Sequence, residues 1–347
     1  MARKVKFRIG PRVIGEDALP FVIAEAGINH EGNVRKALQL VNAAAKAGAD
    51  CIKFQCHITE EEMIPTDIKP LGISRERLWD IIKRCELSPE EERRVQKECQ
   101  RRGILYLSTP FSRAAADRLQ RMGVPAFKIG SGECNNFPLL EHVAQFKKPV
   151  ILSTGMNDIN SIRQAVDIFK RRRVPLMLMH CTSMYPTPYS KVRLGAVREL
   201  QGSFKLPVGL SDHSRGIYTC LGATALGACA FEKHFTISRA WPGPDVPISI
   251  EPIELSELVK GVRAVWEARG GRKTILPDEK PVIEFAYATV VTIRSIRKGD
   301  ELTMANIWVK RPGVGPLMAK DFGRVLGQRA KRDLPKDVPI GRTDFGK

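Results

Sequence analysis

The chain has 347 residues, 43% of them hydrophobic and 27% charged, which is an ordinary composition for a soluble enzyme. No apolar stretch approaches the ~20 residues that a membrane-spanning helix needs, and the basic N-terminus lacks the apolar core of a secretory signal. These features argue against a membrane protein and against a secreted protein, so we expect a cytoplasmic protein without a membrane partner.

The formal net charge of +18 raises a second class of function, that of a basic protein that binds nucleic acid. The distribution of the charge argues against this alternative. Only KRRR at 170–173 is a dense basic run, and it lacks the interleaved aromatic residues on which bases stack. An anionic small-molecule substrate accounts for the excess of Lys and Arg equally well, and we expect no nucleic acid partner.

Eight short apolar runs between residues 21 and 236 predict the strands of a parallel sheet. Each run is rich in Ile, Val, Leu or Phe, as is typical of strands that are buried on both faces. Each run also ends in a cluster of polar residues. In chain order the runs are FVIAEAG (21–27), CIKFQ (51–55), LYLSTP (105–110), AFKIGSG (126–132), PVILSTG (149–155), LMLMHCT (176–182), PVGLSDH (207–213) and AFEKHFT (230–236).

Segments with helical periodicity alternate with these runs. In 34–50 apolar residues recur at helical spacing and Gly48 closes the segment. Ser88, Pro89 and Glu91 form the sequence pattern of a capping box at the start of a further helix. Eight strands that alternate with helices predict a closed (β/α)8 TIM barrel, an α/β fold. The other helical segments are 112–123, 159–173, 217–228 and 254–271, and the capped helix spans 88–103.

Two parts of the chain depart from this alternation. Between the second and third runs, 57–80 predicts an insertion over the barrel mouth that serves as a lid or a substrate wall. Beyond the last helix, polar residues and Pro predict a linker, and short β-type runs broken by Gly and Pro predict a compact β-rich domain. The predicted boundaries are 1–20 for an N-terminal extension, 21–271 for the barrel, 272–285 for the linker and 286–347 for the β-rich domain.

The polar clusters that end the eight runs should meet at one mouth of the barrel. In barrels of this kind the C-terminal ends of the strands carry the active site. The side chains that we expect at this mouth are Glu25, Lys53, Gln55, Thr109, Lys128, Ser131, Ser153, Asp212, His213 and His234.

His213 and His234 end two successive runs, so their imidazoles should lie at the same depth on neighbouring strands. Imidazole nitrogen is a common ligand of divalent metals, and two protein ligands leave positions open on the ion. Such an ion could polarise a carbonyl group, with Mn²⁺ or Mg²⁺ as plausible as Zn²⁺. The alternative is that each histidine only satisfies a hydrogen bond in a packed site.

Lys53 and Lys128 predict an anion pocket on the second to fifth strands. A buried ammonium group is costly unless an anion balances it. Three hydroxyl side chains lie at neighbouring strand ends, and the glycines of GSGE and STG allow backbone N–H groups to approach an oxyanion. The alternative is a set of ion pairs with Glu25 or Glu133. The three hydroxyl residues are Thr109, Ser131 and Ser153.

Carboxylates at the same mouth could bind hydroxyl groups or transfer protons. Glu25 and Glu133 follow strand ends and are candidates for both roles. Asp245 lies in a Pro-rich loop shortly after His234, where it either reaches a polyol or forms a solvent-exposed turn. Arg311, in the predicted β-rich domain, has the sequence context of an ordinary surface arginine.

A series of motifs in this order resembles the sialic acid synthase family, and most closely its bacterial N-acetylneuraminate synthases. The motifs together are specific, whereas STP or SDH by itself would carry no information. They are IAEAGINHEGN (23–33), KFQ (53–55), STPFS (108–112), KIGSGECNN (128–136), ILSTGM (151–156), HCTSMYPTP (180–188), GLSDHS (209–214), EKHFT (232–236), PGPD (242–245) and WVKRPG (308–313).

The resemblance implies a transferase that condenses phosphoenolpyruvate with N-acetylmannosamine and water to N-acetylneuraminate, releasing phosphate by C–O cleavage. It implies that His213 and His234 bind a divalent metal, with Mn²⁺ as first choice and Mg²⁺ or Co²⁺ as alternatives. Glu133 is our candidate for handling the water. Residues implied to hold phosphoenolpyruvate, two of them also catalytic, are Lys53, Thr109, Lys128, Ser131, Ser153 and Ser211, and those implied to contact the sugar are Glu25, Gln55, Tyr185 and Asp245.

The resemblance also concerns the C-terminal domain and the assembly. It implies an antifreeze-like (SAF) domain that packs on the partner's barrel in a domain-swapped homodimer, with Arg311 reaching the partner's site to contact the N-acyl group. Ser183 stands where the bacterial pattern has Asn, which implies a shorter or water-mediated contact to the phosphate or carboxylate.

Two other enzyme functions fit part of this pattern. Legionaminic and pseudaminic acid synthases are relatives that use 2,4-diacetamido sugars, although HITEEEM (57–63) and GECNN (132–136) look more like the neuraminate branch. A barrel lyase or aldolase with a Schiff base on Lys128 is the second alternative.

Overall fold

The computed structural model describes residues 5–70 and 74–346. It consists of two compact units, Met1–Gly270 and Gly271–Lys347, each of which has a hydrophobic core of its own. Residues 1–4 of the predicted N-terminal extension and residues 71–73 of the predicted insertion lie outside the described residues. No helix within the described ranges is long and apolar enough to cross a membrane.

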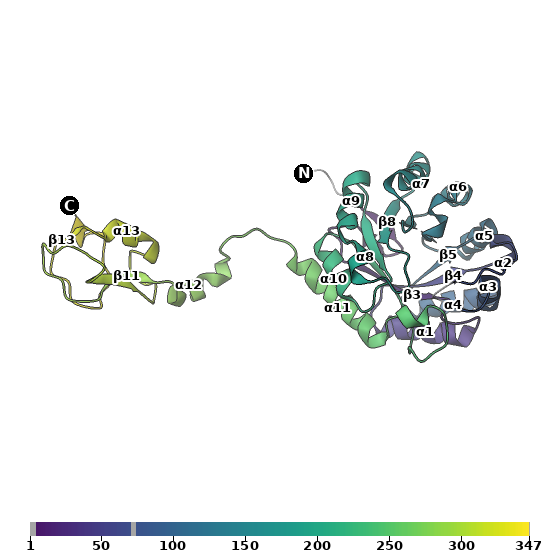
Figure 1. The fold of residues 1–347 in the computed structure, drawn as a ribbon, viewed down its shortest axis with the longest axis horizontal. Coiled ribbons are helices and arrows are strands. Elements are labelled where there is room, and N and C mark those ends of the chain that lie inside the picture. Colours follow the sequence, from purple (N-terminus) through teal and green to yellow (C-terminus); the bar gives the residue numbers. More distant parts are fainter. Residues whose placement is uncertain (1–4, 71–73, 347) are drawn as a thin grey trace. The chain divides into compact units, whose positions relative to one another are not determined.

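The first unit is a barrel of eight strands, and the predicted TIM-barrel fold is confirmed (Figure 1). The hydrogen-bonded neighbours in this ladder pair in parallel. The ladder runs in the order β5-β4-β3-β10-β9-β8-β7-β6, and its end strands β5 and β6 contact each other and complete the ring. The strands are β3 Phe21–Gly27, β4 Cys51–Cys56, β5 Leu105–Pro110, β6 Phe127–Ile129, β7 Val150–Ser153, β8 Leu176–Cys181, β9 Val208–Asp212 and β10 Ala230–His234.

Helices surround the strands and bury their apolar faces on them (Figure 1). The predicted capping box is confirmed, because the Ser88 hydroxyl accepts a hydrogen bond from the Glu91 backbone and the Glu91 side chain accepts one from the Ser88 backbone. Gly103 ends this helix in the left-handed conformation at φ +70°. The helices of this unit outside the insertion are α1 Val34–Lys46, α4 Pro89–Arg102, α5 Arg113–Met122, α6 Phe137–Gln145, α7 Ile159–Arg171, α8 Tyr189–Val192, α9 Gly195–Phe204, α10 Tyr218–Ala225 and α11 Pro252–Ala268.

A short antiparallel hairpin closes the N-terminal end of the barrel. It is formed by β1 Phe7–Ile9 and β2 Arg12–Ile14. Ile9 and Ile14 are buried in the cluster that fills the barrel interior, together with the residues that begin several strands. The side chains at the opposite end of the strands are therefore free to form the site.

The predicted insertion lies between β4 and α4 and contains two short helices, α2 Thr59–Glu62 and α3 Leu78–Cys85. On α3 the apolar residues Ile81 and Ile82 are buried and the charged residues point outward. Two 3₁₀ turns, η1 Gly132–Asn135 and η2 Val246–Ile248, follow β6 and β10.

The second unit is small and rich in short strands. Its core contains Val290, Ile307, Leu317 and Ile340. The predicted linker is not entirely irregular, because 277–286 forms a 3₁₀ turn and a short helix. The elements are η3 Pro277–Glu279, α12 Lys280–Ala286, β11 Thr289–Thr292, β12 Ile307–Lys310, η4 Ala319–Asp321, α13 Phe322–Val325, β13 Arg329–Ala330 and β14 Phe345–Gly346.

Candidate active site

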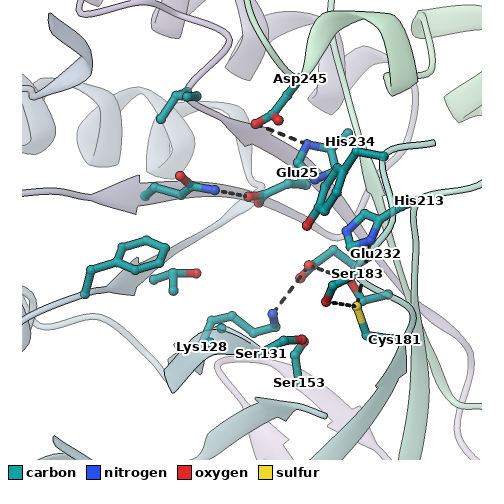
Figure 2. A pocket seen from close by; sticks show the side chains of 18 of the residues that line it. Glu25, Lys128, Ser131, Ser153, Cys181, Ser183, His213, Glu232, His234 and Asp245 are labelled. Atoms are coloured by element: carbon teal, nitrogen blue, oxygen red, sulfur yellow. Dashed lines mark hydrogen bonds and ion pairs between the residues drawn. The ribbon is translucent and has the colours of Figure 1, made fainter. Parts of the chain in front are cut away.

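A cavity of about 570 Å³ opens at the C-terminal ends of the barrel strands. Most of the site residues predicted from sequence line it, and they come from all around the ring (Figure 2). These lining residues are Glu25, Lys53, Gln55, Thr109, Lys128, Ser131, Ser153, Ser183, Tyr185, Ser211, His213, His234 and Asp245.

The strand register brings these side chains together. In the parallel ladder Glu25 is paired with Lys53 on one side and with His234 on the other. Gln55 is paired with Thr109 in the same way. Since all strands point the same way, one polar residue near the end of each is enough to build a continuous polar rim.

Two lysines and two glutamates form a buried charged cluster in the cavity. Lys53 Nζ lies 2.6 Å from Glu25 Oε2 and 3.9 Å from Glu232 Oε2, and Lys128 Nζ lies 3.4 Å from Glu232 Oε1. All four residues are at most 5% exposed. Burial of the charges is therefore offset by mutual pairing, and the ion-pair alternative holds for Glu25 but not for Glu133.

The cluster shifts the proton affinity of its members in different directions. Burial raises the pKa of Glu25 to about 7, although Lys53 opposes the shift. Burial lowers the pKa of Lys128 despite the attraction of Glu232. Burial also favours the neutral form of Glu232, but Lys128 and Lys53 outweigh it and lower the pKa of that carboxyl. Glu232 is thus the fixed counter-ion, and Glu25 is the carboxyl that can exchange a proton near neutral pH.

Hydroxyl groups lie beside the two lysines. Lys53 Nζ donates to Thr109 Oγ1 at 3.1 Å, and the Ser131 hydroxyl accepts from the backbone N–H of Gly155 at 3.0 Å. Ser153 Oγ is buried and has no hydrogen-bond partner within the described residues. Lys128, Ser131 and Ser153 lie together in Figure 2, away from Asp245. An anion that accepts hydrogen bonds from this group would satisfy the free hydroxyl.

The two histidines face the same cavity, with ring centroids 5.3 Å apart. His213 Nδ1 lies 3.0 Å from the Thr182 carbonyl oxygen and donates there, which fixes the ring and leaves Nε2 as the nitrogen for a ligand. Burial lowers the pKa of His213, but the neighbouring Cys181 outweighs burial and raises it. His234 Nδ1 is buried without a hydrogen-bond partner in the described part of the chain. Burial and the neighbouring His213 hold the pKa of His234 well below its usual range, so its ring is neutral.

Imidazole rings held in a fixed orientation suit a divalent metal. Among the described residues no group of three or more His, Cys, Asp or Glu side chains could hold a metal ion. A metal held by this pair would therefore have two protein nitrogens and several open positions. The hydrogen-bond alternative accounts for His213 Nδ1 but not for His234 Nδ1, which lies 3.7 Å from Asp245 Oδ2, beyond hydrogen-bond distance (Figure 2).

A second polar group lies around Gly27, where the backbone has φ +51°. A Cβ atom at this position would lie 3.3 Å from Glu25 Oε1, 3.4 Å from Asp245 Oδ2 and 3.6 Å from Gln55 Nε2. Asp245 is 14% exposed at its side chain, and burial raises its pKa to about 6. The interpretation of Asp245 as a solvent-exposed turn residue is therefore wrong.

Two residues predicted at this mouth, Glu133 and Asp212, do not line the cavity. Glu133 lies in η1, where its side chain accepts from Asn136 Nδ2 at 2.6 Å, and it is not among the lining residues. Asp212 points away from the mouth and forms a buried ion pair with Lys233 at 2.9 Å. Arg311 belongs to the second unit, where it is exposed.

Sequence reasoning missed several lining residues. Glu232 precedes His234 by two positions on β10, so strand alternation places both on the inner face, and this spacing was a usable signal. The predicted insertion contributes Pro70 and Leu78 to the cavity, and α3 continues beyond it with Ile81 and Ile82. The apolar lining residues are Ile28, Leu78, Ile81, Ile82, Phe111 and Met156.

Comparison with known proteins places this site in a family. The model of the NeuB family matches residues 40–274, which is more than half of the chain, and the SAF domain model matches residues 287–345. The chain belongs to the NeuB family. The resemblance to sialic acid synthases and the SAF domain predicted from the motifs are thereby confirmed.

Relatives of this NeuB-family protein are sugar acid synthases. It is 36% identical to the N,N'-diacetyllegionaminic acid synthase of Campylobacter jejuni over 92% of this chain and 98% of that protein. It is 35% identical to human N-acetylneuraminate-9-phosphate synthase over 95% of this chain and 93% of that one. A crystal structure of N-acetylneuraminic acid synthetase from Leptospira borgpetersenii superposes with a TM-score of 0.74 at 35% identity, covering 81% of this chain and 96% of that chain.

Proposed function

We propose that this protein condenses phosphoenolpyruvate with a 2-acetamido sugar aldehyde and water, forming a nine-carbon acidic sugar and phosphate. One observation carries the proposal: two buried lysines, a free buried hydroxyl, two neighbouring histidines and an exchangeable carboxyl line the same cavity. This set matches a reactant with a phosphate and a carboxylate on one side and a carbonyl reactant on the other.

The lysine side of the cavity is the proposed site of phosphoenolpyruvate. Lys53 and Lys128 would bind its phosphate and carboxylate together with the neighbouring hydroxyl groups, Thr109, Ser131, Ser153, Ser183 and Ser211. Ser211 Oγ donates to Glu232 Oε1 at 3.0 Å and so holds the counter-ion of the lysines in place.

His213 and His234 would hold a divalent metal, with Mn²⁺ as first choice and Mg²⁺ or Co²⁺ as alternatives. When bound, such an ion supplies Lewis acidity toward the aldehyde oxygen of the open-chain sugar. Tyr185 stacks on His213 with ring centroids 4.2 Å apart and holds that imidazole against the cavity wall. Glu25, Gln55 and Asp245 would bind the sugar hydroxyl groups.

The proposed reaction forms one C–C bond and breaks one C–O bond. The enol carbon of phosphoenolpyruvate attacks the aldehyde carbon, and the neighbouring carbon gains cationic character. Water adds to that carbon, and the tetrahedral product expels phosphate. Because Glu133 does not line the cavity, we reassign the proton transfer from this water to Glu25, whose pKa burial raises to about 7.

Two sugars are candidates for the second substrate. N-acetylmannosamine, implied by the motifs, needs the polar group around Asp245. A 2,4-diacetamido sugar carries a second acetamido group in place of a hydroxyl, and the apolar wall of Ile28, Ile81 and Phe111 suits the methyl end of that group. The similarity to a legionaminic acid synthase supports this second candidate.

Phosphate release tests the proposal. The purified protein with Mn²⁺ and phosphoenolpyruvate should release phosphate only when one of the two sugars is present, and the preferred sugar should have the higher kcat/KM.

A chelator should abolish release reversibly, and His213→Ala and His234→Ala should abolish it permanently, because the aldehyde is no longer polarised. Full activity after extensive chelation would exclude the metal.

Borohydride distinguishes this mechanism from a Schiff-base aldolase. Incubation with pyruvate and borohydride should leave Lys128 unmodified, as judged by intact-protein mass spectrometry. Covalent trapping of pyruvate on Lys128 would favour the aldolase. Membership of the NeuB family disfavours the third alternative, a nucleic-acid-binding protein.

A further inference from the structure

His57 follows the last residue of β4 and bridges the insertion to the cavity without lining the cavity itself. Its ring is 4% exposed and stacks on Phe111 with centroids 4.6 Å apart. Nδ1 lies 2.9 Å and 3.0 Å from the two carboxylate oxygens of Glu62, on α2. Nε2 lies 2.9 Å from Gln55 Oε1. The proposed function assigns no role to this buried histidine.

The hydrogen bonds around His57 require two donors on its ring. Both carboxylate oxygens of Glu62 are acceptors, so Nδ1 donates to them. The Gln55 amide has a defined orientation because its Nε2 donates to Glu25 Oε1 at 3.3 Å. The amide oxygen therefore faces His57. His57 Nε2 must donate to it. The chain of contacts Glu62–His57–Gln55–Glu25 has a single consistent direction.

We infer that His57 is a positioning residue for the sugar: it fixes the Gln55 amide so that the NH₂ group, rather than the oxygen, lies beside the Glu25 carboxyl. This inference deepens the proposed function and rests on it, because it assumes that the sugar binds at Gln55 and Glu25. In this orientation one N–H and one carboxylate lie side by side in the cavity. A sugar hydroxyl can accept from the first and donate to the second.

Loss of the two His57 donors would remove the preference for this orientation of the Gln55 amide. The Gln55 amide would then be free to turn and present its oxygen, which places two acceptors beside each other at the same hydroxyl. That hydroxyl has only one proton to donate, so one acceptor would be left without a partner. Phosphoenolpyruvate binds on the lysine side, so its binding should not depend on the amide orientation.

A double-mutant cycle tests the inference through the Michaelis constants. His57→Phe keeps the ring on Phe111 and removes both donors. We expect the KM for the sugar to rise roughly 10- to 100-fold, with an unchanged KM for phosphoenolpyruvate. In a Gln55→Met background the same substitution should cause no further rise, because His57 acts through Gln55. Additive effects, or an equal rise in both KM values, would overturn the inference.

A matched control and a rescue of folding complete the experiment. His142 also pairs with a carboxylate, Asp117, at 2.7 Å and contacts a phenylalanine ring, but it lies outside the cavity, so His142→Phe should leave the sugar KM unchanged.

His57→Phe leaves Glu62 unpaired and could impair folding. His57→Phe combined with Glu62→Met removes that charge and should still show the raised sugar KM, whereas the parental KM in this double variant would overturn the inference.

The protonation of His57 can be measured without any substrate. In ¹⁵N-detected spectra of the intact protein at neutral pH, the ring should show the shifts of two protonated nitrogens, assigned by their loss in His57→Phe. A neutral tautomer would overturn the inference even in an active enzyme. Failure of phosphate release with every sugar would instead reject the proposed function and leave the spectroscopic result standing.

Discussion

Glu25 is a carboxyl whose pKa depends on the three other charged groups of the cluster, Lys53, Glu232 and Lys128. It shares Lys53 with Glu232, and Lys128 pairs with Glu232 as well. Burial raises the pKa of Glu25 to about 7. This carboxylate can therefore accept a proton near neutral pH, which is what its proposed role toward the attacking water requires.

The raised pKa of Glu25 predicts how stability depends on pH. Between its ordinary value of 4.5 and about 7 the folded protein holds a proton that the unfolded chain has lost. The free energy of unfolding should therefore fall as pH rises through this window. In Glu25→Gln this fall should be smaller by about 1–3 kcal/mol, measured by denaturant unfolding at several pH values. Equal slopes in the parent and the variant would contradict the assignment.

The residues that sequence reasoning misplaced have two physical causes. Side chains alternate along a strand, so Ser211 and His213 face inward and Asp212 must face outward. Reading only the polar ends of the runs ignored this alternation and also overlooked Glu232. Glu133 follows the strand by several residues and lies in a 3₁₀ turn, where the direction of a side chain cannot be extrapolated from the strand.

At the scale of elements, the strands were predictable because each is a short apolar run that is buried along all or nearly all of its length. The helices α6 and α9 were not predicted. The first begins with Phe-Pro and the second contains two glycines, so neither has strong intrinsic propensity, and packing on the barrel stabilises both. The helical turn α12 was missed for the same reason, since a proline occupies its first turn.

The contact between the loop after β3 and the insertion gives a prediction at this scale. Gly32 has φ +73°, and a Cβ atom there would collide with the Arg84 carbonyl oxygen of α3. Gly103 has a similar φ of +70° but no atom within 4 Å. Gly103→Ala should cost about 1 kcal/mol of unfolding free energy, and Gly32→Ala at least roughly twice as much, as measured by denaturant unfolding.

Gly32→Ala should also disturb function, because relief of the collision moves α3 and the apolar wall that it carries. The sugar KM should rise in this variant and remain unchanged in Gly103→Ala. Equal stability losses in the two variants would show that the loop and α3 do not press on each other.

At the scale of the whole molecule, the second unit has a core of its own and carries Arg311. The proposed domain-swapped dimer would bring this arginine to the partner's cavity, where a guanidinium could bind the N-acyl oxygen of the sugar. Neither sequence pattern nor the fold of one chain determines such an arrangement, because it depends on contacts between two copies.

Complementation between variants tests this arrangement. Arg311→Ala should raise the sugar KM, and His213→Ala should be inactive. When the two are co-expressed, random pairing should restore roughly a quarter of the parental activity at low sugar concentration, since each mixed dimer has one intact site. Activity that equals the sum of the two separate variants would show that Arg311 serves its own chain or no site.

The insertion places part of the cavity wall on an element that does not belong to the barrel sheet. Most of the side chains proposed to act in the reaction lie on barrel strands, where strand register and packing constrain each position. Leu78, Ile81 and Ile82, which form part of the apolar wall, lie on α3 instead. Substitutions on α3 can reshape one wall of the cavity while leaving the strand ladder intact. A lineage, or an engineer, could therefore alter which sugar is accepted by mutating one short helix, without rebuilding the reaction centre.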